Sequence, residues 1–132
     1  MADAIDIPAW IALFFGVYAL SAAIGELRRP GGWAALLVHF ERDIGLRFLT
    51  GIVCLGFGAL IYLVSPWRPD DWLAVLVTVL GGWMALEGAL LIAFGDVFLA
   101  IARRLAGAAN KLWAWLSFFI GVGLIAAALI RL

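Results

Sequence analysis

Residues that build catalytic and metal sites are scarce in this chain, which has one histidine, His39, and one cysteine, Cys54, among 132 residues. A lone cysteine excludes an intrachain disulfide. A single histidine outside the apolar stretches leaves none within them to ligate a haem. The sequence also lacks a P-loop, HExxH, GxSxG and any paired-cysteine spacing. We therefore expect a protein that is not an enzyme and that carries no metal or cofactor.

Charge is scarce as well: 14% of the residues are charged and 67% are hydrophobic, and the mean hydropathy is +1.13. No soluble domain of this size buries that much apolar surface. A spanning helix needs about 20 mostly apolar residues to cross a hydrocarbon core of about 30 Å. Four stretches qualify, namely residues 8–27, 46–64, 72–95 and 112–130. The sequence therefore predicts an all-α integral membrane protein with four transmembrane helices, forming a single membrane domain over residues 1–132.

The start of the chain lacks the positive residues that open a cleaved secretory signal. Residues 1–6 contain Asp3 and Asp6 and no lysine or arginine. We therefore expect the first span to be retained.

The basic residues are distributed unevenly about the predicted spans. Seven of the nine lie on one side, and only Arg68 and Arg131 lie on the other. By the positive-inside rule the basic side is cytoplasmic, so both termini and the 65–71 loop are expected on the outer side. The residues of the basic face are Arg28, Arg29, Arg42, Arg47, Arg103, Arg104 and Lys111.

The two halves of the chain resemble each other. Residues 8–64 align with residues 74–130 at an offset of 66 in the first helix of each half and 65 in the second. The alignment predicts two tandem helical hairpins, 8–64 and 72–130, joined by the 65–71 loop and related by a pseudo-two-fold axis along the membrane normal. Chance similarity between glycine-rich and alanine-rich helices is the alternative. The candidate helix-packing residues are Ala19, Ala23, Ala85, Gly88, Ala89, Gly56, Gly58, Gly121 and Gly123.

Each half carries an amphipathic stretch between its two spans. After the break at residues 30–32, apolar residues from Trp33 to Ile44 recur at helical spacing, while His39 and neighbouring charged residues fall largely on the other side. Such a helix can lie in the headgroup plane with its apolar face in the acyl boundary. We favour the interpretation that it completes and anchors the hairpin. The other interpretation is a docking surface for a partner protein or an anionic lipid.

Glu87 is the only ionisable residue deep inside a predicted span. A charged residue at a helix centre costs roughly 2.5–3.5 kcal/mol on insertion scales, so it usually faces the bundle interior and has a partner. The polar groups at suitable depth are Ser21, Tyr18, Thr50 and Cys54. In one interpretation Glu87 exchanges protons with a substrate or cation. In the other, which we favour, it hydrogen-bonds to Ser21 or a backbone carbonyl and sets helix register.

Two acidic residues lie close to basic ones at helical spacing. Glu26 precedes Arg29 by three positions, and Asp43 precedes Arg47 by four. We expect both to form surface ion pairs of small energetic weight.

The second half of the chain resembles a known family. The resemblance is carried by Leu86-Glu87-Gly88, the run to Gly95, a basic amphipathic connection and a glycine-rich last helix ending in Arg131. Residues 74–131 are similar to very short two-helix bacterial inner-membrane proteins of unknown function, in which proline tends to follow the first helix where Gly95 stands here. The resemblance implies a duplicated, fused version of such a unit in a bacterial inner membrane, and the distribution of basic residues then predicts both termini on the periplasmic side. It implies no activity.

Two functions follow from these features. The first is a non-enzymatic accessory or scaffold subunit that packs in the lipid bilayer against other membrane proteins or against itself as a homo-oligomer, with no nucleic-acid partner. The alternative is a small oligomeric transporter or channel with Glu87 as the proton- or cation-coupled group. Small multidrug transporters also have four helices and one membrane glutamate, but theirs lies in the first helix. A lipid-modifying enzyme is a third possibility, since His39, Glu41 and Asp43 cluster, but no nucleophile or metal ligand completes that site.

Overall fold

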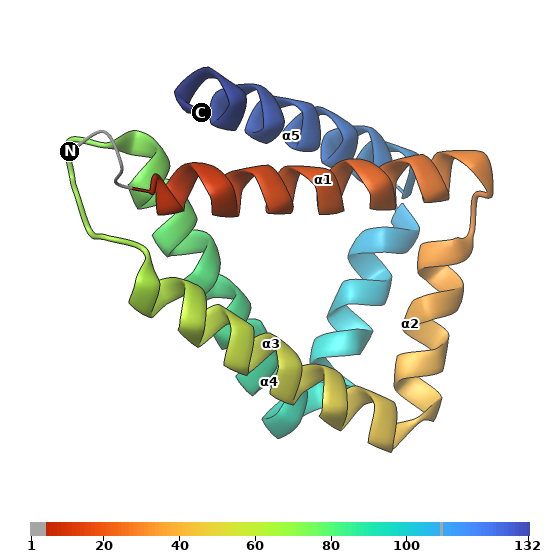
Figure 1. The fold of residues 1–132 in the computed structure, drawn as a ribbon. Coiled ribbons are helices and arrows are strands. Elements are labelled where there is room, and N and C mark those ends of the chain that lie inside the picture. The colour runs from red at the N-terminus through yellow and green to blue at the C-terminus, as the bar shows by residue number, and fades with distance from the viewer. Residues whose placement is uncertain (1–4, 109) are drawn as a thin grey trace.

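The computed structural model describes residues 5–108 and 110–132, and Asp3 lies outside them. It is built from helices alone over these residues (Figure 1). In chain order they are α1 (Ile7–Arg28), α2 (Gly32–Arg42), α3 (Ile44–Val64), α4 (Trp72–Ala108) and α5 (Asn110–Arg131). Four segments are long and apolar enough to cross a membrane: Ile7–Arg28, Ile44–Val64, Trp72–Leu105 and Lys111–Arg131. The predicted all-α fold with four spans is confirmed, and α2 is the amphipathic connection of the first half.

Aspartates at the helix starts satisfy backbone N–H groups that have no partner within the helix. The Ala9 N–H donates to Asp6 at 3.2 Å in α1, the Leu46 N–H donates to Asp43 at 3.0 Å in α3, and the Leu73 N–H donates to Asp71 at 3.2 Å in α4. The interpretation of Asp43 as a partner of Arg47 is therefore wrong. Its carboxylate caps α3, because a short side chain just before a helix reaches the first free N–H groups more readily than an arginine one turn later.

The predicted third span ends where α4 bends. Phe94 has non-helical backbone angles (φ −133°, ψ 41°) inside α4, one residue before the predicted end at Gly95. The Arg47 side chain lies so close to Gly95 that an added Cβ would stand 2.7 Å from Arg47 Cδ. Beyond the bend α4 continues as the basic, amphipathic segment of the second half. The amphipathic connection predicted after the third span is therefore part of the same helix as that span.

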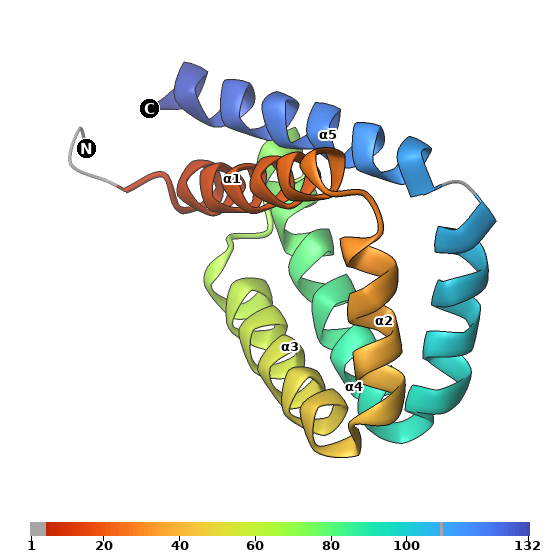
Figure 2. The ribbon, with the colours of Figure 1, turned by 90° about the vertical axis from the view of Figure 1, so that its right-hand side faces the viewer.

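The spans pack in two pairs, α1 with α5 and α3 with the part of α4 before Phe94. In Figure 1 these two pairs form two sides of a triangle, and α2 with the last part of α4 forms the third. Figure 2 shows α2 running down from the end of α1 toward the start of α3. The first span of each half therefore packs against the second span of the other half, an arrangement that the order of the helices alone did not predict.

The two pairs converge at the end of the molecule that carries the start of α1, the end of α5 and the 65–71 loop, which we call the terminal end (Figure 1). A small apolar core lies there, formed by Ala9, Ala12, Leu73, Val77, Leu124 and Ala128. At the opposite end, which we call the basic end, the pairs are apart and are bridged by α2 and the last part of α4. Large apolar side chains cover the outside of the spans, as contact with a lipid bilayer requires.

Candidate functional site

Glycines bring α3 and α4 into close contact. Gly51 and Gly58 on α3, and Gly81 and Gly88 on α4, are each seven residues apart and so share a helix face. A Cβ added at Gly58 would meet the backbone nitrogen of Ala85 and would lie 2.7 Å from the Gly81 carbonyl oxygen. All four glycines are buried. The two backbones therefore approach as closely as small residues in membrane helices permit.

The α1 and α5 pair is built in the same way. Gly16 and Gly121 face each other, and a Cβ added at either would lie 2.8 Å from the carbonyl oxygen of the other. The Ser117 hydroxyl donates to the Ala19 carbonyl at 2.9 Å, and Ala23 is fully buried. Small residues thus line this contact along most of its length.

Other candidate packing residues lie elsewhere. Gly56 and Gly123 have no atom of another residue within 4 Å of an added Cβ. Each stands two residues from a contact glycine, Gly58 or Gly121, which turns it about 200° around the helix and away from the contact. Among the described residues, neither Gly56 nor Gly123 takes part in helix packing. Ala89 is half-buried.

Glu87 bonds within its own helix. The Trp83 indole N–H donates to the Glu87 carboxylate at 2.6 Å, and Trp83 is 58% exposed. Glu87 precedes Gly88 by one position and therefore stands about 100° around α4 from it, beside the α3 contact and within electrostatic range of Cys54 on α3. Among the residues that the structure describes, no side chain of another helix donates to this carboxylate. The expected bond to Ser21 or to a backbone carbonyl is not formed.

Cys54 lies near Glu87, whereas the other polar candidates make no hydrogen bond with Glu87 in the described part of the chain. Tyr18 is 73% exposed on α1, and Ser21 on the same helix is exposed. The Thr50 hydroxyl donates to the Leu46 carbonyl of its own helix at 2.8 Å. Polar groups from different spans thus form no continuous path in the described part of the chain.

At the terminal end one arginine joins three helices. Arg131 of α5 donates to Asp71 at 2.6 and 2.8 Å and to Asp6 at 3.0 and 3.3 Å. Both carboxylates also cap helices, Asp6 at the start of α1 and Asp71 at the start of α4. We call this group the Arg131 clamp. The sequence contained a signal for it, since aspartate one or two residues before an apolar run is a helix-start pattern.

The Arg131 clamp makes the stability of the fold depend on pH. The hydrogen bond from Arg131 is the main cause that lowers the pKa of Asp71 from 3.8 to about 2. Because the pKa is lower in the folded state than in the unfolded state, the ionised carboxylate stabilises the fold above about pH 4, and this contribution, about 2 kcal/mol, is lost as the pH falls toward 2.

We therefore expect the thermal midpoint of the wild-type protein in detergent to fall more steeply between pH 5 and pH 2 than that of Asp71→Asn, whose side chain still caps α4. Thermal unfolding followed by circular dichroism across this range measures the difference. Parallel curves for the two proteins would contradict the role of Asp71.

Glu26 is buried at the basic end, with 5% of its surface exposed. Its carboxylate accepts the Gly31 and Trp33 N–H groups, both at 2.9 Å. These are N–H groups at the start of α2, and Gly31 there has φ of 102°, a conformation that favours glycine. The prediction that Glu26 forms a surface pair with Arg29 is wrong, because the turn at residues 29–31 brings the start of α2 back onto the Glu26 side chain.

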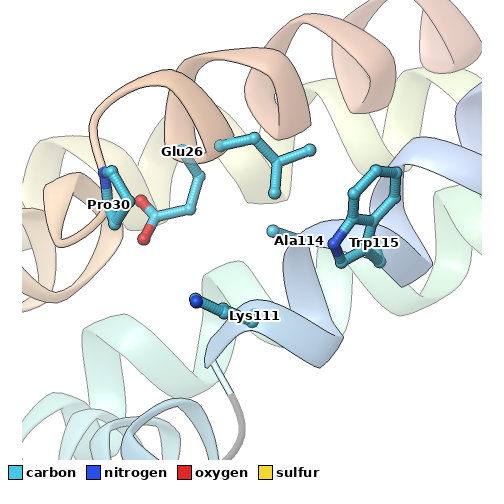
Figure 3. A pocket seen from close by; sticks show the side chains of 6 residues that line it. Glu26, Pro30, Lys111, Ala114 and Trp115 are labelled. Atoms are coloured by element: carbon cyan, nitrogen blue, oxygen red, sulfur yellow. The ribbon is translucent and has the colours of Figure 1, made fainter.

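Glu26 also borders a cavity of about 250 Å³ between α1 and α5, where Lys111 and Trp115 line the other wall. Figure 3 shows Glu26 from α1 and Lys111 from α5 on opposite sides of this space. The two side chains do not form an ion pair. The carboxylate is already satisfied by two N–H groups.

Seven of the nine basic residues lie at one end of the helices, as predicted, while Arg68 and Arg131 lie at the terminal end. Arg28 is in the last turn of α1, Arg42 in the last turn of α2 and Arg47 in the first turn of α3. Arg103 of α4 pairs with Glu41 of α2 at 3.0 Å and so ties the two bridging segments together. Arg28, Arg29, Arg42, Arg103, Arg104 and Lys111 are exposed, and Arg47 is half-buried.

The fold and these contacts define the chain as a small multi-span membrane protein in contact with the lipid bilayer. Among the described residues, no three histidine, cysteine, aspartate or glutamate side chains lie close enough together to hold a metal ion. Comparisons with protein-family models, with curated proteins and with solved structures find no match to the chain. Any more specific function has to be argued from the geometry.

Proposed function

We propose that the chain is a non-enzymatic subunit of a membrane assembly and that a helix of another subunit packs against α4 at Glu87. The observation that carries this proposal is the carboxylate itself. It lies 15 residues into α4 and bonds only to Trp83 of the same helix among the described residues. A carboxylate within a span normally faces protein and has a partner. A donor from a neighbouring subunit meets this requirement.

The way the spans pack supports association. Each span packs closely against one other span. Only 11% of the most apolar 18-residue stretch of α3 is buried within the chain. Gly56 and Gly123 stand on outward faces where a further helix can approach closely. The partner is another membrane protein or a second copy of this chain.

The alternative, a transporter or channel with Glu87 as the coupled group, has less support. Transport requires several polar groups along one path. In the described part of the chain Tyr18, Ser21 and Thr50 do not meet Glu87, and Thr50 bonds within α3.

Substitutions at Glu87 separate the two functions. In a subunit we expect Glu87→Gln to keep the assembly, because the amide still hydrogen-bonds, and Glu87→Leu to weaken it about tenfold. Mass determination of the tagged protein purified in mild detergent measures this, with Asp70→Leu in the exposed loop as the control. Ala85 and Gly88 are unsuitable for this test because they form the contact with α3.

Loss of cation-driven transport in Glu87→Gln, with the assembly intact, would instead support the transporter. A monomeric protein with no co-purifying partner would contradict the subunit proposal.

A duplicated two-helix unit is also proposed, and the contacts support it. The Gly16 and Gly121 contact corresponds to that of Gly81 and Gly58, since Gly121 lies against Leu20 N as Gly58 lies against Ala85 N. Asp6 and Asp71 cap equivalent helices. Residues that make equivalent contacts are 65 positions apart in the first helix of each half and 63 positions apart in the second. These offsets differ from the offsets of 66 and 65 that the sequence alignment predicts.

The orientation of the protein follows from the same proposal. The charge of the basic end favours placing it in the cytoplasm of a bacterial cell, with the Arg131 clamp on the periplasmic side of the inner membrane.

A further inference from the structure

An apolar cavity of about 540 Å³, open to the outside along part of its length, lies between the two helix pairs, toward the basic end. Its walls come from α1, α2, α5 and both parts of α4, and they include Phe15, Leu80, Ala102, Leu105 and Ile120. Tyr18 and Ser117 supply the only hydroxyl groups, and the Ser117 hydroxyl already donates to Ala19. A polar ligand would therefore find almost no partners there. The occupant has to be apolar over most of its length.

The cavity is too small to enclose a transmembrane helix. A helix about 10 Å across that spans a hydrocarbon core of about 30 Å fills roughly 2,000 Å³, about four times the space available. A volume of 540 Å³ lies instead within the range of sites that bind single small apolar ligands. In a bilayer the acyl chain of a lipid is the apolar ligand at hand. Glu87 is not among the lining residues, so this cavity is distinct from the proposed subunit contact.

The segments that close the cavity at the basic end carry positive charge. Ala102 and Leu105 line the cavity, and Arg103 and Arg104 lie between them in the sequence. Arg103 pairs with Glu41, whereas Arg104 has no acidic partner among the residues described. Lys111 lies two positions before Trp113, about 200° around α5 from it, and lines the cavity beside Glu26 instead. Arg104 is therefore the cation that is free to attract a negative headgroup.

Two tryptophans mark the level at which such a headgroup would lie. Trp33 of α2 and Trp113 of α5 both line the cavity, and the Trp113 indole N–H donates to the Leu105 carbonyl at 2.8 Å. Tryptophan prefers the boundary between acyl chains and headgroups. The cavity thus has an apolar interior, aromatic residues at the boundary and cations beyond it, in the order found along a phospholipid.

We propose that this cavity binds one anionic phospholipid, with an acyl chain between the two helix pairs and its headgroup at Arg104. The bound lipid fills the space that the diverging pairs leave open, and it holds α2 and the last part of α4 in place against α1 and α5.

Native mass spectrometry of the full chain in mild detergent tests this, with equal amounts of phosphatidylglycerol and phosphatidylcholine of the same acyl chains as probes. We expect one retained phosphatidylglycerol, with a preference of about tenfold over phosphatidylcholine. Ala102→Trp places an indole in the cavity and should reduce retention about tenfold. Ala100→Trp, on the same helix but exposed and outside the cavity, should retain the lipid. Arg104→Gln should remove the preference.

Equal retention of the two lipids by the wild-type protein would overturn the proposal, and so would equal retention by Ala102→Trp and Ala100→Trp. If Ala102→Trp lacks wild-type helix content by circular dichroism, the smaller change Ala102→Leu provides the comparison. A protein rather than a lipid bound in the cavity would also overturn it. None of these outcomes depends on whether Glu87 contacts another subunit.

Discussion

Replacing Gly58 with leucine is expected to separate α3 from α4 and to lower the free energy of unfolding by about 3 kcal/mol or more. The reason is the backbone contact: a Cβ at this position would meet the nitrogen of Ala85 and would lie 2.7 Å from the carbonyl oxygen of Gly81. Backbone atoms cannot rotate away as a flexible side chain does, so the helices must move apart. That movement also opens the contacts made by Gly51 and Gly88 along the same face.

The matched control for this substitution is Gly56→Leu. Gly56 lies on the same helix two residues earlier, and a Cβ there has open space within 4 Å. We expect its thermal midpoint in detergent, followed by circular dichroism, to match the wild-type value within the error of the method. Similar losses of stability in the two variants would show that α3 is sensitive to any leucine, and the proposed contact would then be wrong.

Replacing Arg131 with glutamine is expected to be the second most damaging change, at about 2 kcal/mol of stability. The Arg131 guanidinium lies 2.6 Å from Asp71 and 3.0 Å from Asp6, and all three side chains are largely shielded from solvent. Without it, two carboxylates that cap neighbouring helices face each other with no cation between them. The starts of α1 and α4 then repel each other, and the end of α5 loses its contacts with both.

A second substitution distinguishes repulsion from a general loss of contacts. Asp6→Asn added to Arg131→Gln removes one negative charge, and asparagine remains a good cap for α1. We expect the double variant to recover part of the lost stability in urea unfolding of the detergent-solubilised protein. Arg68→Gln, in the exposed loop at the same end, serves as the control. Further destabilisation of the double variant would mean that repulsion is not the cause.

The helices themselves were predictable because membrane spans are encoded locally. About 20 apolar residues in succession are sufficient for a span, whatever the rest of the chain does. The third span was predicted to end at Gly95, and the backbone of α4 leaves helical geometry at Phe94. The gathering of basic residues at one end follows from the span boundaries in the same way.

The candidate site was less predictable because it depends on which faces meet. Gly56 and Gly58 are equivalent in composition, yet only Gly58 contacts α4. Glu26 and Asp43 were expected to form surface ion pairs, and both instead cap the next helix. Helical spacing shows which residues lie near each other on one helix. It does not show that a turn brings the next helix start within reach of the same carboxylate.

A helical protein with four membrane spans and seven of its nine basic residues at one end could be predicted from the amino-acid order, because hydropathy and charge act residue by residue along the chain. Only the folded arrangement shows that α1 pairs with α5 and α3 with α4, that Arg131 joins three helices at the terminal end, and that an apolar cavity remains between the pairs. These features depend on contacts between residues far apart in the chain, and apolar helices in a bilayer choose their neighbours by the fit of small residues and by a few hydrogen bonds, which hydropathy does not reveal.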